Sequence, residues 1–360
     1  MKLLYYVDDD RSNFGDDLNR WLWKRLLGSA LDVDDGTVLL GIGTILARGF
    51  VPPARKYIVL SSGVGYDAPP SDFGGPSWQV LAVRGPLTAS VLELTPDKAA
   101  TDGAALLRLL PACEPLPESE RSGIVFMPHY ESLAAGNWRQ VSEMAGVEFL
   151  DPCADSEITV QRIRRARLVI ADAMHAAIVA DALRVPWIPV VLSPHSSTFK
   201  WLDWTMSLDL PYRPVTIPAS TLLEALRNNS LRSFGNKLYV ETHTAADAIE
   251  HLKRVIRLWS SNDWPRRRHT RSLVTYAIPR RIVSSPVFRG FKTSQDSFRI
   301  RRAAEALRKI AEMPSFLSDE RVFQSKLDRL ASFLPALSAE AQQQAELRAS
   351  SHTGAPAEPQ

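Results

Sequence analysis

The stretch RSNFGDDLNRWLW, residues 11–23, joins two hydrophobic patterns of different period near the start of the chain. The apolar run KLLYYV, residues 2–7, precedes it and is typical of a buried strand. Within the stretch, Leu18, Trp21 and Leu22 recur at the spacing of an amphipathic helix, which we predict over residues 16–27. A simple strand-to-helix connection needs neither the glycine nor the paired aspartates of this corner. The corner is therefore a candidate binding site as well as a connection.

The alternation of strand and helix patterns continues as far as residue 193. Several apolar runs are hydrophobic almost throughout, as in parallel strands that are buried on both faces. Six further runs predict strands: TVLLG (37–41), YIVLSSG (57–63), WQVLAVRG (78–85), GIVFMPH (123–129), RLVIAD (167–172) and WIPVVLS (187–193). Four more helices are predicted over residues 86–93, 137–145, 156–165 and 173–184. The sequence thus predicts an α/β fold with parallel sheets.

A change of composition divides the chain. The segment PACEPLPESERSG, residues 111–123, concentrates Pro, Glu and Ser and predicts a domain boundary. We expect two Rossmann-like domains, residues 1–115 and 120–262, that face a cleft at the carboxyl ends of their strands. Residues 263–345 are arginine-rich and then helical in pattern, which indicates a basic helical extension. The small polar residues 346–360 predict a disordered tail.

The formal charge of +3 is unevenly distributed. Residues 264–309 contain 13 Lys and Arg against 2 Asp and Glu, so the rest of the chain is acidic. The two cysteines, Cys113 and Cys153, form neither a disulfide framework nor a metal-ligand spacing. The apolar run at the N-terminus is too short for a signal peptide, and no stretch is long enough to span a membrane. These features predict a cytoplasmic protein.

Polar residues and glycines gather where the predicted strands end, which is where ligands bind in open α/β sheets. Each has a structural alternative, because glycines shape turns and acidic residues in a first helical turn complement the helix dipole. No G-x-G-x-x-G fingerprint, P-loop or H-E-x-x-H motif occurs, so neither a nucleotide cofactor nor a metal is indicated. The candidates at these corners are Asn13, Gly15, Asp16, Asp17, Arg84, His129 and His175.

Two of these candidates have a specific chemical reason. His175 follows the run RLVIAD and precedes a helix of small residues, and an imidazole there can transfer protons at neutral pH. The alternative is a buried structural histidine, and His129 is in the same position after its own strand. Arg84 ends an apolar run and precedes Gly-Pro, so its guanidinium would point into the cleft beside a helix N-terminus and bind an anion. The alternative is an ordinary surface arginine.

Seven motifs occur in a characteristic order along residues 1–212. Together they resemble the polysaccharide pyruvyl transferase family, especially its succinoglycan and xanthan branch. The resemblance implies a two-domain fold similar to GT-B glycosyltransferases. It also implies transfer of pyruvate from phosphoenolpyruvate (PEP) onto two hydroxyls of one sugar, which forms a cyclic ketal and releases phosphate. The motifs are NFGDDLN, GIGTIL, VRGPLTA, TDGA, FMPHYES, MHAAIVADALRVPW and FKWLDW.

The resemblance also assigns roles to residues. The family's catalytic histidine falls on His175, and an arginine that resembles an anion ligand falls on Arg84. Many members have an arginine two positions before the histidine, where this chain has Ala173. The second cation for PEP would then be Arg84, Lys200 or His129. Asn13, Gly15, Asp16 and Asp17 would form a floor that accepts sugar hydroxyls.

Other functions are compatible with the same sequence. One alternative is a GT-B-type glycosyltransferase that uses a nucleotide-sugar donor, and another is a non-catalytic scaffold of polysaccharide assembly. The expected acceptor is a sugar in an exopolysaccharide or its lipid-linked precursor. The basic segment predicts either a helix packed on the second domain, with Ile300, Ala303, Ala304, Leu307, Ile310 and Ala311 on one face, or a peripheral contact with an anionic membrane. No motif supports nucleic-acid binding.

Overall fold

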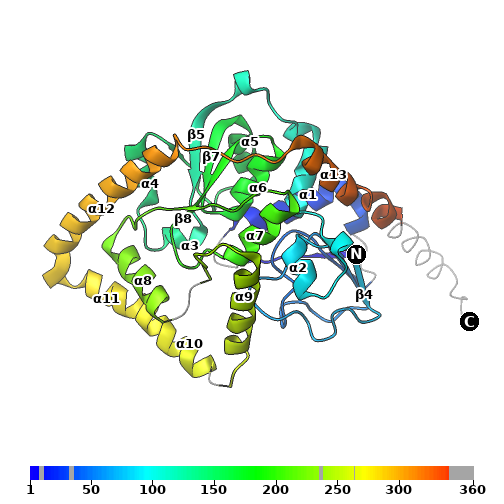
Figure 1. Cartoon of the computed structure of the whole chain (residues 1–360), viewed down its shortest axis with the longest axis horizontal. Helices are drawn as coiled ribbons and strands as arrows, with labels where there is room; N and C mark the ends of the chain where they lie inside the picture. The colour runs from blue at the N-terminus through cyan, green and yellow to red at the C-terminus, as the bar shows by residue number, and fades with distance from the viewer. Residues whose placement is uncertain (8–11, 32–35, 235–237, 263, 340–360) are drawn as a thin grey trace, which may run out of the picture.

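The computed structural model describes residues 1–7, 12–31, 36–234, 238–262 and 264–339, and its strands form two parallel sheets (Figure 1). The first sheet has the order β1-β2-β3-β4, and the second has the order β6-β5-β7-β8-β9. All seven predicted strands are present, so the α/β class with parallel sheets is confirmed. The first sheet consists of β1 (Lys2–Leu4), β2 (Thr37–Leu40), β3 (Lys56–Leu60) and β4 (Trp78–Ala82). The second consists of β5 (Ser122–Met127), β6 (Glu148–Phe149), β7 (Ala166–Ala171), β8 (Trp187–Val191) and β9 (Val215–Thr216).

The five predicted helices are also present, with ends that differ from the prediction by up to two residues. The short strands β6 and β9 were not predicted, since two residues leave no hydrophobic period. The helix that follows β8 was not predicted either. The α-helices of this part are α1 (Phe14–Leu27), α2 (Pro86–Val91), α3 (Tyr130–Leu133), α4 (Trp138–Ala145), α5 (Ser156–Arg165), α6 (Met174–Ala182) and α7 (Thr198–Ser207). Short 3₁₀ turns are η1 (Gly28–Leu31), η2 (Pro96–Lys98), η3 (Gly103–Leu109), η4 (Pro111–Cys113) and η5 (Glu118–Glu120).

Helix α1 is fixed by its buried face and by one buried amide. Leu18 and Leu22 are fully buried in the core. The Asn19 amide donates to the carbonyl of Ile42 (3.1 Å) and accepts from its N–H (3.0 Å). Asn19 also accepts a hydrogen bond from Trp23 Nε1 at 2.9 Å. Because these bonds satisfy a buried amide, they hold α1 against the corner that follows β2.

One apolar cluster connects the two sheets. It includes Leu39 and Ile58 of the first sheet, Val169 of the second, and Ala177 of α6 between them. The segment 111–123 lies between the last strand of the first sheet and the first strand of the second. The division into domains at residues 1–115 and 120–262 and the GT-B-like arrangement stay predictions.

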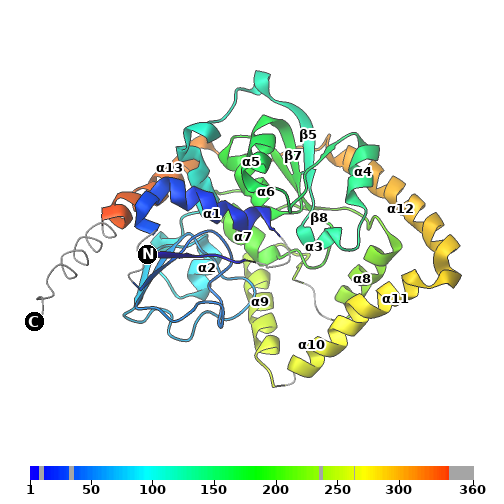
Figure 2. The same ribbon diagram turned by 180° about the vertical axis from the view of Figure 1, so that it is seen from behind.

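The extension is helical and returns along the molecule, as Figures 1 and 2 show. Helix α12 packs against α4, and its face of Ile300, Ala303, Ala304, Leu307 and Ile310 is buried, so the predicted packed helix is confirmed. Residues 340–345 and the predicted tail 346–360 lie outside the described residues. Before the extension come α8 (Leu222–Ser233) and α9 (Ala245–Trp259). The extension contains α10 (Trp264–Ser272), the π-helix η6 (Leu273–Ala277), α11 (Ile278–Ser284), the 3₁₀ turn η7 (Pro286–Phe288), α12 (Arg289–Ile310) and α13 (Glu320–Ala331). Within the described ranges, no helix has the length and apolarity to cross a membrane.

A buried ion pair ties the first sheet to α7. Arg84 follows β4, and its Nε donates to Asp203 Oδ2 at 2.9 Å, with both side chains fully buried. The same carboxylate accepts from the N–H of Thr88 (2.8 Å) and from its hydroxyl (2.6 Å). The Arg84 Nη atoms donate to Thr44 Oγ1 and to the carbonyl of Val64, each at 2.9 Å. The pair is therefore hydrogen-bonded on both sides, as a buried pair must be.

We expect the Asp203→Ala substitution to lower the free energy of unfolding by about 3–5 kcal/mol, because it leaves the Arg84 guanidinium buried without its counter-charge. Urea denaturation followed by circular dichroism measures the change. The matched control is Glu250→Ala, which removes an exposed ion pair with Arg257 and should cost no more than about 1 kcal/mol. A loss below about 1 kcal/mol in the Asp203→Ala variant would contradict the structural role of the pair.

Candidate functional site

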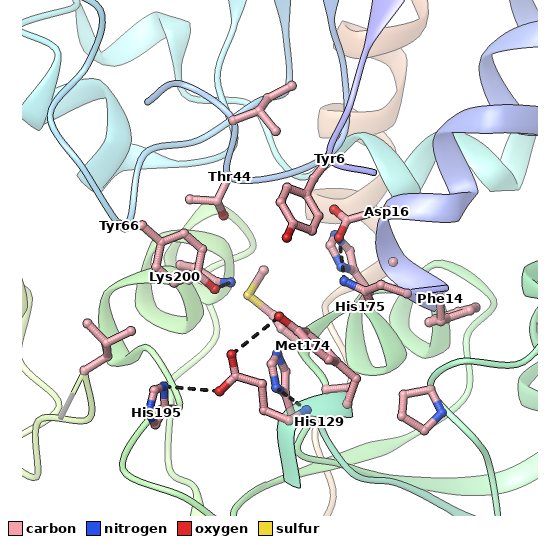
Figure 3. A pocket seen from close by; sticks show the side chains of 18 of the residues that line it. Tyr6, Phe14, Asp16, Thr44, Tyr66, His129, Met174, His175, His195 and Lys200 are labelled. Carbon is pink, nitrogen blue, oxygen red and sulfur yellow. Dashed lines mark hydrogen bonds and ion pairs between the residues drawn. The ribbon is translucent and has the colours of Figure 1, made fainter. Parts of the chain in front are cut away.

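A pocket of about 360 Å³ opens at the carboxyl ends of the strands, where segments of both sheets meet (Figure 3). In the second sheet it lies at β5 and β7, the point at which the strand order reverses. This is where open α/β sheets bind ligands, and the volume suits a small molecule. The lining residues that the structure describes include Tyr6, Asn13, Phe14, Gly15, Asp16, Thr44, Phe50, Tyr66, His129, Tyr130, Glu131, Ala173, Met174, His175, His195 and Lys200.

Two helices begin at this pocket. Asn13 precedes α1 and Ala173 precedes α6, and neither residue caps its helix with a side-chain hydrogen bond. Both helices are more than two turns long, so their dipoles and the N–H groups of their first turns favour an anion in the pocket, although the N–H of Phe14 in α1 already donates to the carbonyl of Pro152 at 2.8 Å. The sequence predicted that Arg84 attracts an anion to the pocket. In the structure, backbone N–H groups supply part of this attraction.

His175 stands in the first turn of α6 and lines the pocket. Its ring packs directly on Gly15, since a Cβ at that glycine would lie 1.9 Å from His175 Nδ1. Gly15 therefore serves first to admit the imidazole, whereas the sequence predicted that it admits the ligand. Burial lowers the pKa of His175 to about 4, against a raising effect of Asp102, so the imidazole is neutral at pH 7.

Asp16 lies beside His175 at the start of α1 (Figure 3). Burial raises the pKa of its carboxyl to about 7, although Lys200 and the amide of Asn13 act in the opposite direction. The Asn13 amide donates a hydrogen bond to Asp16 Oδ2. The predicted corner thus places a carboxyl that is half protonated near neutral pH next to a neutral imidazole.

Lys200 approaches from α7 on the side of the pocket opposite Asp16 (Figure 3). Its Nζ donates to the Tyr66 hydroxyl at 2.6 Å and lies 4.5 Å from the centre of the Tyr66 ring. Among the lining residues that the structure describes, Lys200 is the sole Lys or Arg. Three residues were considered as substitutes for the arginine that many family members have at position 173. Of these three, Lys200 is the one whose charge faces the pocket.

His129 lines the pocket but is held as a neutral structural group. Its Nδ1 accepts from the N–H of Glu131 at 3.4 Å, which caps α3. Burial lowers the pKa of His129 to about 4, so it carries no charge at neutral pH. The buried Asp172 accepts from the N–H groups of His129 (2.9 Å) and Leu192 (3.3 Å) and fixes the ends of β5 and β8 relative to each other.

Two predicted site residues are not in the pocket lining. Arg84 does not point into the cleft, because its guanidinium is buried against Asp203, Thr44 and Val64. The prediction that it contacts an anion directly is therefore wrong, although its bond to Thr44 supports the pocket wall. Asp17 is turned to the outer side of α1, where its carboxylate accepts from Ser12 Oγ. Helical geometry explains this difference, since adjacent residues lie about 100° apart on a helix.

Sequence reasoning missed the aromatic walls and a third histidine. Tyr66 directly follows the glycines of the corner after β3. This position at the end of a strand could have identified it as a pocket residue. Tyr6 stacks near Phe50 with ring centres 6.1 Å apart. His195 lies 3.2 Å from Glu131 through its Nδ1 and 3.5 Å from the Tyr276 hydroxyl of the extension through its Nε2. Among the described residues, no three His, Cys, Asp or Glu side chains are grouped so as to hold a metal ion.

The fold and pocket define an α/β protein with a small-molecule-sized pocket where its two sheets meet. Comparison with known proteins assigns it to a family: the chain is 38% identical over 222 residues to the succinoglycan biosynthesis protein ExoV of Rhizobium meliloti (strain 1021). The match covers 62% of this chain and 70% of that protein. The chain belongs to the same family of polysaccharide biosynthesis proteins. No family model and no solved structure matches it.

The raised pKa of Asp16 makes stability depend on pH. Because the folded-state pKa of about 7 exceeds the ordinary value of 3.8, the folded protein binds more protons, and this contribution to stability is lost as pH rises from about 4 to about 7. An Asp16→Asn variant has no ionisable group at this position, so its stability does not fall in this way as the pH rises. We expect its free energy of unfolding to gain about 4 kcal/mol relative to the original protein over that range, since a shift of one pKa unit corresponds to about 1.4 kcal/mol. Urea titrations at pH 4, 5.5, 7 and 8 test this, and a difference that does not change with pH would contradict it.

Proposed function

We propose that this protein transfers pyruvate from PEP onto two hydroxyls of one sugar in an exopolysaccharide or its lipid-linked precursor. The observation that carries the proposal is the meeting of two uncapped helix N-termini, Lys200, Asp16 and His175 in one pocket. The motif resemblance and the relationship to a succinoglycan biosynthesis protein support it.

The donor has the chemistry that this pocket favours. PEP carries a phosphate and a carboxylate, and such groups bind to backbone N–H groups at helix N-termini and to a lysine. Lys200 and the starts of α1 and α6 are on different sides of the pocket, so they can engage both anionic ends. The absence of an arginine at position 173 is therefore compatible with PEP binding.

The acid and the base are two different residues in this proposal. A neutral His175 suits the general base, whereas a half-protonated Asp16 suits the general acid, and pairs whose environments separate their pKa values in this way mark acid–base sites. The proton transfer that the sequence predicted for His175 is thus limited here to the role of the base. Asp16 gives its proton to the methylene carbon of PEP, and C2 becomes electrophilic.

The remaining steps conserve atoms and charge. The first sugar hydroxyl forms a bond to C2 and gives its proton to His175. The bond from C2 to the phosphate oxygen breaks, and the second hydroxyl of the same sugar closes the ketal. The two hydroxyls release two protons in total. One of them, held by His175, reprotonates Asp16, and the other goes to the departing phosphate, which restores the site. The aromatic rings of Tyr6, Tyr66 and Tyr130 form apolar walls suited to the faces of a sugar ring.

The experiment incubates the full chain with PEP and a panel of lipid-linked oligosaccharides. We expect phosphate release together with an added pyruvate ketal, detected by mass spectrometry of the acceptor. The His175→Ala variant should lose about 10²–10⁴-fold in rate because it lacks the base. His269→Ala, an exposed histidine of α10, is the matched control and should keep full activity.

A parallel reaction with nucleotide-sugar donors separates the alternatives. Nucleotide release without use of PEP would instead support a glycosyltransferase. Near-normal transfer by a folded His175→Ala protein would refute the role of the histidine. No turnover with any donor, alongside binding of the oligosaccharides, would favour a scaffold.

The proposal includes a peripheral contact with the cytoplasmic face of an anionic membrane, where lipid-linked acceptors would be reached. The alanine-rich face of α12 is not available, because it is buried against the second sheet. Exposed apolar side chains instead lie around the α11–α12 corner, beside the exposed Arg280 and Arg281. Such a mixture of apolar and cationic side chains suits an anionic lipid surface. The apolar members are Ile278, Ile282, Val287, Phe291 and Phe298.

We expect the protein to co-sediment with vesicles that contain phosphatidylglycerol, and less so at high salt. Replacing Arg280 and Arg281 by Gln should weaken binding about 30-fold, at about 1 kcal/mol for each cation. The matched control replaces Lys253 and Arg254, which are exposed on α9, by Gln. Equal binding to neutral and anionic vesicles, or equal effects of the two double variants, would contradict the contact.

A further inference from the structure

Asp102 is a buried carboxylate of the TDGA motif that has one unused oxygen. It precedes η3, and its Oδ1 accepts from the N–H of Ala104 at 3.0 Å. Its side chain is fully buried, and its Oδ2 has no hydrogen-bond partner. A buried carboxylate oxygen without a hydrogen-bond partner lowers the stability of the fold, so we expect a group nearby that could become its partner.

This group is His175. Its Nε2 lies 3.8 Å from Asp102 Oδ2, and this nitrogen is itself buried without a hydrogen-bond partner. The two unpartnered atoms therefore face each other at a distance slightly longer than a hydrogen bond. Such bonds are often long in a free enzyme and shorten when substrate is bound.

The other ring nitrogen of His175 has a different environment. Nδ1 lies over Gly15, where the absence of a side chain gives it room, and Gly15 and Asp16 both line the pocket. Nε2 thus points to the first-sheet half of the molecule, at the start of η3, and Nδ1 is on the pocket side. The two sides of the imidazole have separate partners.

We propose that Asp102 is the positioning residue of His175: it holds the Nε2–H form of the imidazole and leaves the Nδ1 lone pair free to take a proton from the acceptor hydroxyl. When Nδ1 is protonated, the imidazolium charge is balanced by the Asp102 carboxylate. This is how a carboxylate supports a catalytic histidine in other enzymes. The arrangement needs both halves of the chain, because Asp102 and His175 follow strands of different sheets.

The first test concerns the resting protein and does not depend on the proposed function. Nitrogen-15 NMR of the full chain, labelled at histidine, reports which ring nitrogen of His175 carries the proton at pH 7. We expect Nε2–H and an unprotonated Nδ1. In an Asp102→Asn variant the amide can donate to Nε2, so the proton should move to Nδ1. An Nδ1–H form in the original protein would overturn the proposal.

The second test concerns transfer and rests on the proposed function. Asp102→Asn keeps the Oδ1 that caps η3, and it should lower kcat by about 10²–10⁴-fold with KM for PEP changed less than about threefold. In a His175→Ala background the same substitution should have no further effect. The matched control is Asp97→Asn, an exposed acid of the same segment that pairs with Arg329. Transfer within about twofold of the original by Asp102→Asn, or an equal loss in both backgrounds, would also overturn it.

Discussion

The position of the pocket depends on the guanidinium of Arg84. It joins the corner after β4 to Asp203 of α7, to Thr44 of the corner after β2, and to Val64 of the corner after β3. Lys200 is one helical turn before Asp203 on the same helix, so the ion pair that holds α7 also sets the place of the pocket lysine. A charge that is fully buried requires such partners, and their geometry is therefore narrowly defined.

Burial has opposite effects on the two titrating groups of the pocket. It disfavours the charged form of each, which raises the pKa of Asp16 and lowers that of His175. The free pocket thus holds a half-protonated acid and an uncharged base beside Lys200, Glu131 and two helix N-termini. Lys200 and the two helix N-termini favour a ligand with two negative groups, and partial protonation of Asp16 reduces the repulsion that such a ligand meets.

The extension contributes to the site as well as to the surface. Its helix α12 completes the covering of the second sheet by burying an alanine-rich face, which leaves the cations outward. Tyr276 of η6 reaches His195 at the edge of the pocket, and His195 in turn lies against Glu131. The part of the chain that the motifs describe least therefore borders the pocket.

The sequence by itself determined the strands, most helices and the corners, because hydrophobic periods of 2 and 3.6 residues and glycine at turns are local properties. It also identified Asp16, His129, His175 and Lys200 as pocket residues through the order of the motifs. Only the tertiary structure decided that Arg84 is paired inside the protein, since its partner Asp203 is 119 residues away. The facing of Asp102 and His175, and the shifted pKa values of Asp16 and His175, likewise follow from burial between two sheets, which no local pattern encodes.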